Sequence, residues 1–164
     1  MTSEEKDINP KYLELIKQLA AYKSRGDIQG AMQVYSEDIV LESPPFGQKA
    51  VGANDVLDQM GKFFTLFPDY AVALNRYQIL PGEAERIQGV GDITMTLNKS
   101  VLGFSSPMLK ATTPVAITFS FKQQHINYEL FDFDLSHLLS QYRLTAEERG
   151  QLDGLLKPTV EVSE

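Results

Sequence analysis

The 164-residue sequence contains no cysteine and no tryptophan. Without cysteine, the chain cannot form a disulfide, use a thiolate nucleophile, or bind zinc or an iron–sulfur cluster through sulfur. Its two histidines, His125 and His137, are too few for a metal site built from histidines alone. We therefore expect no metal site of either kind.

Positive charge and long apolar runs are also scarce. The chain has 15 Lys and Arg residues against 22 Asp and Glu residues, which gives a net charge of −7. Nucleic acid is therefore not an expected partner, because binding it requires a basic, phosphate-neutralising surface. The apolar runs are far shorter than the roughly 18 residues that span a bilayer, and the opening MTSEEKDINP lacks the apolar segment of a secretory signal. We expect no membrane partner and a cytoplasmic location.

The composition favours one folded domain, since 43% of the residues are hydrophobic and 23% are charged. We expect a flexible N-terminus over residues 1–9, a folded domain over 10–143, and a helical appendix and tail over 144–164. Thr145 and Glu148 have the spacing of a capping box before a short helix that runs toward Leu156. The last residues, 158–164, are expected to be loose.

The first half of the sequence predicts three helices, each with apolar residues at helical spacing. Asn9 is expected to cap a helix that begins at Pro10, and Asp27 is expected to cap a short second helix. Asn54 is expected to cap a third helix that ends before Pro68, because the residue preceding a proline disfavours helical geometry.

Strand patterns dominate the second half. A brief strand is predicted at 39–41 and is expected to stop before the two prolines that follow it. Alternating or β-branched runs then cover 70–80, 86–97, 115–122 and 126–133. Helices followed by a mostly antiparallel meander indicate an α+β fold with the helices on one face of the sheet. A parallel Rossmann-type sheet is disfavoured.

Several short motifs within residues 10–143 resemble the SnoaL-like polyketide cyclases of the nuclear transport factor 2 superfamily. The motifs are YKSRGDIQGAMQVYSEDIVLESPPFG, FFTLFPD, LGFSSP and HINYELFDFDLSHLLSQY. The resemblance implies a cystatin-like cone, in which a curved, mostly antiparallel mixed sheet carries three N-terminal helices on its concave face and is followed by a short C-terminal helix. It also implies a mouth that admits a small hydrophobic molecule, and a homodimer formed through the outer sheet face.

The resemblance further implies a catalytic aspartate. Cyclases of this family use an aspartate near the end of the final strand as acid and base for an aldol closure, and Asp134 occupies the matching position. Strand alternation puts Asp132 on the same face as Asp134, and His137 lies close enough in sequence to pair with Asp134. This chemistry requires no cofactor. The alternative is that Asp132 and Asp134 cap the segment that starts at Leu135.

The predicted pocket is apolar, with a few polar groups. Tyr128 could offer its hydroxyl to a ligand carbonyl, and Asp92 could be a second pocket acid or could lie on the outer face of the sheet. The remaining predicted ligand-binding residues are hydrophobic: Leu130, Phe46, Phe63, Phe67, Phe104 and Met108.

Some residues depart from the patterns of related enzymes. The family usually has a tryptophan four residues before the catalytic aspartate, whereas this chain has Leu130 there. Ser43 stands before Pro44 where a ketosteroid isomerase would have an aspartate, and no arginine lies between Asp92 and Asp132 as a limonene-epoxide hydrolase would need. Two functions stay open: a cyclase or isomerase acting on a hydrophobic carbonyl compound, and a non-catalytic module that binds a small molecule.

Overall fold

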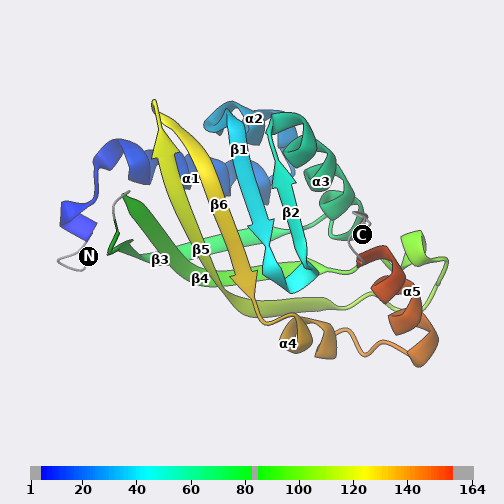
Figure 1. The fold of residues 1–164 in the computed structure, drawn as a ribbon. Helices are drawn as coiled ribbons and strands as arrows, with labels where there is room; N and C mark the ends of the chain where they lie inside the picture. The colour runs from blue at the N-terminus through cyan, green and yellow to red at the C-terminus, as the bar shows by residue number, and fades with distance from the viewer. Residues whose placement is uncertain (1–4, 83–84, 157–164) are drawn as a thin grey trace, which may run out of the picture.

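A curved sheet of six strands forms the body of the part that the computed structural model describes, residues 5–82 and 85–156 (Figure 1). The strands are β1 (Tyr35–Ser43), β2 (Gln48–Val51), β3 (Ala71–Leu80), β4 (Arg86–Thr96), β5 (Lys110–Lys122) and β6 (His125–Phe133). Their order across the sheet is β2-β1-β6-β5-β4-β3. The pairing of β1 with β6 is parallel and the other pairings are antiparallel.

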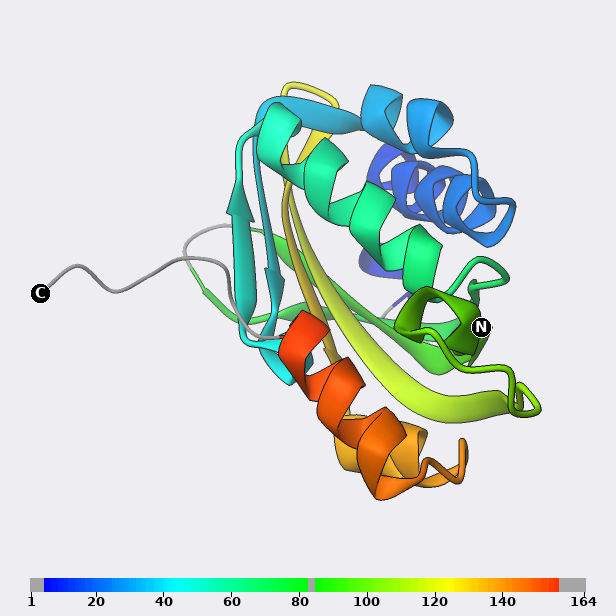
Figure 2. The ribbon, with the colours of Figure 1, turned by 90° about the vertical axis from the view of Figure 1, so that its right-hand side faces the viewer.

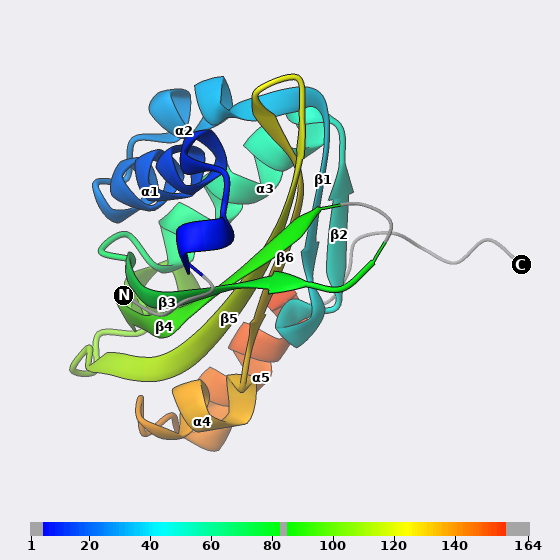
Figure 3. The same ribbon diagram turned by 90° about the vertical axis from the view of Figure 1, so that its left-hand side faces the viewer.

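Three helices cover the concave face of this sheet (Figure 2). They are α1 (Pro10–Ser24), α2 (Ile28–Val34) and α3 (Ala53–Leu66). Two further helices, α4 (Leu135–Ser140) and α5 (Ala146–Leu156), lie at the other end of the sheet. The 3-10 turns are η1 (Glu5–Asp7), which lies beside β3 (Figure 3), η2 (Pro44–Phe46) and η3 (Lys99–Leu102). The predicted α+β cone is confirmed.

Most predicted helix ends are confirmed by their caps. The Asn9 side chain accepts a hydrogen bond from the Lys11 N–H at 3.0 Å, and the Asp27 side chain accepts one from the Gly30 N–H at 2.9 Å. In the capping box, Thr145 Oγ1 accepts from the Glu148 N–H, and Glu148 Oε1 accepts from the Thr145 N–H. Each of these caps joins residues two or three positions apart, so the sequence alone is enough to predict it.

The cap predicted for the third helix is wrong. Helix α3 begins at Ala53, and its N-cap residue is Gly52 instead of Asn54. Gly52 has a φ of 91°, a conformation that glycine adopts without steric penalty. Asp55 in the first turn then reaches back and accepts a hydrogen bond from the Val51 N–H at 2.9 Å. This contact lets the helix start directly after β2.

The sequence patterns also missed three pieces of strand. β1 runs from Tyr35 to Ser43, beyond the predicted 39–41. β2 is a four-residue edge strand for which the sequence predicts no strand, because its short QKAV pattern gives little periodic signal. β5 begins at Lys110 instead of residue 115 and runs through Pro114. Pairing of β5 with β6 starts only at Val115, so Pro114 has a strand neighbour on one side, where its missing N–H is tolerated.

The hydrophobic core lies between the helices and the concave face of the sheet. Fully buried side chains come from both layers: Ile16, Leu19, Ile39, Phe67, Ile87, Phe119 and Ile126. No helix in the described ranges is long and apolar enough to cross a membrane. The predicted loose tail over 158–164, and residues 1–4 of the predicted flexible N-terminus, lie outside the described residues.

Candidate functional site

The last strand determines which carboxylate faces the interior. On β6, the side chains of Glu129, Phe131 and Phe133 are buried, at 1%, 7% and 8% exposure, whereas Asp132 is exposed. A β-bulge explains why Glu129, and not Asp132, faces the interior. Phe121 pairs with Ile126 but Ser120 pairs with Tyr128, so β6 holds one extra residue and its alternation reverses after Ile126. The prediction that Asp132 and Asp134 face the concave pocket is wrong.

Asp134 lies at the exposed N-terminus of α4, where its side chain accepts a hydrogen bond from the His137 N–H at 3.1 Å. The alternative prediction, that Asp134 is a cap, is confirmed. His137 is also exposed, and its Nδ1 lies 2.8 Å from Thr113 Oγ1. Asp132, Asp134 and Asp92 line an open groove on the outer face of the sheet. None of the three predicted catalytic residues reaches the interior.

The predicted ligand-binding residues divide into two groups. Phe46 and Phe63 line the concave cavity described below, and Phe67 is fully buried in the core and lines a neighbouring cavity. Phe46 lies on η2, Phe63 lies on α3, and Phe67 directly follows α3.

The other predicted ligand-binding residues lie elsewhere. Tyr128 and Leu130 alternate with Glu129 and therefore face outward, and the Arg86 guanidinium lies 5.3 Å from the Tyr128 ring centroid. Asp92 is exposed in the outer groove. Phe104 and Met108 lie in the segment between η3 and β5 and do not line the concave cavity; Met108 is 47% exposed. The placement of these five residues in the pocket is wrong.

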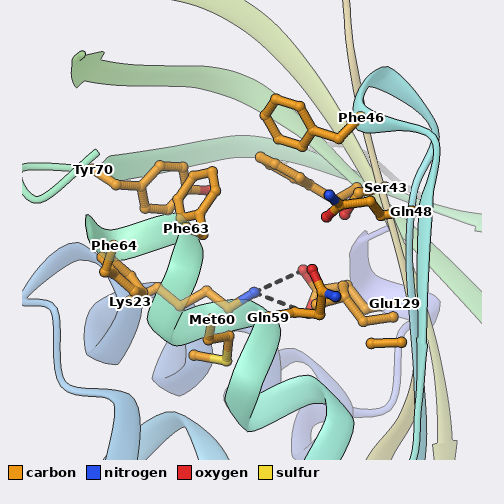
Figure 4. Close-up of a pocket in the computed structure, with 13 residues that line it drawn as sticks. Lys23, Ser43, Phe46, Gln48, Gln59, Met60, Phe63, Phe64, Tyr70 and Glu129 are labelled. Atoms are coloured by element: carbon orange, nitrogen blue, oxygen red, sulfur yellow. Dashed lines mark hydrogen bonds and ion pairs between the residues drawn. The ribbon is translucent and has the colours of Figure 1, made fainter. Parts of the chain in front are cut away.

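A cavity of about 60 Å³ lies between α3 and the concave face of the sheet (Figure 4). Apolar and aromatic side chains make up most of its wall: Phe46, Met60, Phe63, Phe64, Tyr70 and Phe131. A smaller set of polar side chains completes the lining: Lys23, Ser43, Gln48, Gln59 and Glu129. An apolar wall with a few polar groups is the usual composition of a small-molecule site.

A buried ion pair forms one part of the wall. Lys23 Nζ lies 2.9 Å from Glu129 Oε2 and 3.1 Å from Oε1, and the side chains are 13% and 1% exposed. The Tyr35 hydroxyl donates a third hydrogen bond, to Glu129 Oε1, at 2.5 Å. Lys23 lies in the last turn of α1, where the helix dipole favours a cation. The Glu129 carboxylate is thus held in place from two sides, as a buried charge requires.

Tyr70 lies between α3 and β3 and is 3% exposed. Its ring centroid lies 5.1 Å from that of Phe63 and 6.1 Å from that of Phe131. Burial, and then the charge of Glu129, raise the pKa of Tyr70 well above 10, so its hydroxyl stays protonated. The Tyr35 hydroxyl donates to Glu129, whereas the Tyr70 hydroxyl has no protein partner among the described residues. A hydrogen-bond donor therefore faces the cavity unpaired.

The sequence patterns do not point to the polar residues of this cavity. Strand alternation counted from Ile126 puts Glu129 on the face opposite Asp132, and the bulge in β6 that reverses this order has no local sequence signature. Lys23 and Glu129 are 106 positions apart, so the residues near either one do not indicate that they form an ion pair. The sequence does carry one signal, the single carboxylate of Glu129 between Tyr128 and Leu130. It becomes a candidate when either face of the strand is allowed to be the buried one.

No protein-family model matches the sequence, and no curated protein matches it. Solved structures do match. A hypothetical protein from Catenulispora acidiphila DSM 44928, with a ketosteroid isomerase-like fold and in complex with trimethylamine, is 12% identical with a TM-score of 0.68, over 85% of this chain and 98% of that one. A protein from Shewanella denitrificans OS-217, assigned as a SnoaL-like polyketide cyclase, is 12% identical with a TM-score of 0.68, over 81% and 97%.

A third match is a protein of unknown function from Burkholderia pseudomallei K96243, described as like nuclear transport factor 2. It is 15% identical with a TM-score of 0.67, over 83% of this chain and 100% of that one. These structural matches establish the fold, but at identities this low they do not show which reaction or ligand the chain has. The chain therefore has the fold that SnoaL-like polyketide cyclases share with proteins like nuclear transport factor 2, as its sequence motifs predicted.

Proposed function

We propose that the concave cavity binds a small, mainly hydrophobic carbonyl compound. The observation that supports this most is the Tyr70 hydroxyl, which belongs to a buried side chain in the wall of an aromatic cavity and makes no hydrogen bond with another described residue. A ligand carbonyl oxygen would accept a hydrogen bond from this hydroxyl, which contributes about 0.5–1.5 kcal/mol. The rings of Phe63 and Phe131 would bury the apolar part of the same ligand.

The charges around the cavity favour a neutral ligand. Lys23 and Glu129 neutralise each other across 2.9 Å. An anion or a cation entering the cavity would become a buried charge without a counter-ion, which is strongly unfavourable. A carbonyl group avoids this penalty and can accept a second hydrogen bond from the Lys23 ammonium, which has three donors. The trimethylamine bound to the Catenulispora protein supports small-molecule binding by this fold, and no more.

A second candidate function is proton transfer on the bound ligand, which the position of Glu129 in the cavity wall favours. Glu129 would remove a proton from the carbon next to the carbonyl, and the electron pair would move onto the carbonyl oxygen. Tyr70 and Lys23 would stabilise that oxygen. Return of the proton to a different carbon completes an isomerisation. Alternatively, the enolate carbon attacks a second carbonyl, and Glu129 gives its proton to the new alkoxide in an aldol-type cyclisation. Asp134, which caps α4, has no part in this proposal.

The binding proposal is tested with a panel of neutral ketones titrated into the protein and followed by nuclear magnetic resonance. Tyr70→Phe removes only the hydroxyl, so we expect binding about tenfold weaker, equivalent to one hydrogen bond of about 1.4 kcal/mol. Tyr128→Phe is the matched control, because Tyr128 faces outward, and it should bind like the wild type. Equal weakening in both variants, or in neither, would contradict the proposal. Native mass spectrometry of the purified protein would also show a co-purified ligand.

The proton-transfer candidate is tested by exchange of ligand α-protons for deuterium in heavy water. We expect the wild type to accelerate exchange, Glu129→Gln to abolish the acceleration, and Asp134→Asn to leave it unchanged. Circular dichroism checks that the Glu129 variant is folded. Loss of exchange in Asp134→Asn alone would reassign the base, and no acceleration by the wild type would reject catalysis while leaving binding intact.

Two proposals concern the whole protein: the family resemblance supports a homodimer formed through the outer sheet face, and the lack of long apolar runs in the sequence supports a cytoplasmic location. Light scattering on the purified protein tests the dimer, and fractionation of the source cells tests the location. A monomer at micromolar concentration, or recovery outside the cytoplasm, would contradict them.

A further inference from the structure

A second cavity adjoins the first. It has a volume of about 50 Å³ and shares four lining residues with the concave cavity: Phe46, Gln48, Gln59 and Phe63. Its far side is formed by Leu66 of α3 and by Leu155 and Leu156 at the end of α5. Each shared side chain contacts both spaces, so these side chains form the partition where the two cavities adjoin.

The side chains of this partition are held by packing and can move. The ring centroids of Phe46 and Phe63 lie 6.3 Å apart with their planes tilted by 60°, so the rings touch without stacking face to face. The side-chain amides of Gln48 and Gln59 form no hydrogen bond with other described residues, so no polar contact fixes their rotamers. Gln48, Gln59 and Phe63 are half-buried, so their rotamers are less restricted than that of the buried Phe46. A ligand chain would pass between the cavities through rotamer changes of these three side chains, without movement of the backbone.

Helix α5 is positioned to cover the end of the second cavity. Figures 1 and 2 show its C-terminal end, in red, beside the turn between β1 and β2 that carries Phe46. The start of α5 is anchored by a buried cluster: Lys99 Nζ lies 3.4 Å from Glu148 Oε2, and the Ser106 hydroxyl donates to the same carboxylate. Toward the end of α5, Leu152 is fully buried and Leu155 is 53% exposed.

We propose that the two cavities form one elongated site, and that the ligand is a carbonyl compound with an unbranched apolar chain. This rests on the proposed function. The carbonyl oxygen accepts from Tyr70 in the first cavity, and the chain passes between Phe46 and Phe63 and ends beneath Leu156. The first cavity alone has room for the volume of only a few waters, on the scale of about 10–15 Å³ for each. The second cavity nearly doubles that room, and its lining is mainly apolar, with Gln48, Gln59 and Lys62 as its polar members.

The test is the affinity of a homologous series of methyl ketones, from 2-butanone to 2-decanone. Each methylene that enters the second cavity should tighten binding about fourfold, which corresponds to the burial of one CH₂ group. Leu156→Trp fills the second cavity without touching the first. It should bind 2-butanone like the wild type and lose the gain for the longer ketones. Gln151→Trp places the same side chain at an exposed position of α5, and it should behave like the wild type.

Leu66→Phe fills the same cavity from α3 and replaces Leu156→Trp if that variant does not fold. Affinity that does not rise with chain length in the wild type, while 2-butanone binds, overturns the elongated site and leaves the proposed function standing. Equal long-chain affinity in the wild type and a filled variant also overturns it. If 2-butanone and the longer ketones all fail to bind to the wild type, the proposed function and this inference fall together.

Discussion

Removal of the Lys23 ammonium is expected to leave a buried carboxylate without its cation. Lys23→Met keeps the aliphatic stem and deletes both hydrogen bonds to Glu129, which is 1% exposed. Breaking a buried ion pair by removing one partner costs about 3–5 kcal/mol. Because Tyr35 still donates to the carboxylate, we expect a value near the lower end, about 3 kcal/mol. For a domain of this size, that lowers the midpoint of thermal unfolding by roughly 6–12 °C.

Urea unfolding followed by circular dichroism measures this loss, since the chain has no tryptophan to report by fluorescence. Lys122→Met is the matched control. Lys122 Nζ lies 3.0 Å from Asp38 Oδ2, but both side chains are more than half exposed, so the loss of stability should be much smaller than for Lys23→Met. A double variant, Lys23→Met with Glu129→Met, should recover most of the stability, because an apolar pair replaces a buried ionic one. Equal, small losses of unfolding free energy in Lys23→Met and Lys122→Met would show that the buried pair of Lys23 and Glu129 stabilises the fold no more than an exposed one.

Three further predictions concern stability. Asp134→Ala should lower the free energy of unfolding by about 1 kcal/mol through loss of the α4 cap, measured in urea, with ketone affinity unchanged. Burial raises the pKa values of Tyr35 and Tyr70 well above 10, so their contribution to stability is complete below pH 10 and falls above it, as thermal unfolding against pH should show. The Ser106 hydrogen bond is the main cause that lowers the Glu148 pKa from 4.5 to about 2. The contribution of the ionised Glu148 carboxylate to the free energy of unfolding is therefore complete above pH 4.5 and is lost toward pH 2. Glu148→Gln should reduce the dependence of stability on pH in this acid range, as urea unfolding at several pH values would show.

The fold could be predicted because its signals are local. Asn9 and Asp27 bond to backbone groups two or three residues away, and Thr145 bonds to Glu148 within one helical turn. The long alternating runs of β3, β4 and β6 likewise need only neighbouring residues to be recognised. The misplaced cap of α3 fits this pattern, since Gly52 caps through its backbone and gives no side-chain signal.

Phe46 and Phe63 of the site could be predicted, but its polar groups could not, because their position depends on non-local geometry. Strand alternation counted from Ile126 puts Asp132 inside, and one extra residue in β6 puts Glu129 inside instead. That bulge arises from pairing with β5, which the β6 sequence does not encode by itself. The cation opposite Glu129 comes from the end of α1, and the unpaired hydroxyl of Tyr70 comes from the turn after α3. Only the folded cone brings these three groups together.

The central claim is that the ligand lies on the concave face, against Tyr70. The most direct test is a set of intermolecular nuclear Overhauser effects between a bound methyl ketone and the protein. We expect contacts from the ketone protons to the rings of Tyr70, Phe63 and Phe131, which line the cavity. Contacts that cluster instead at Asp92 and Asp132, in the outer groove, would contradict it.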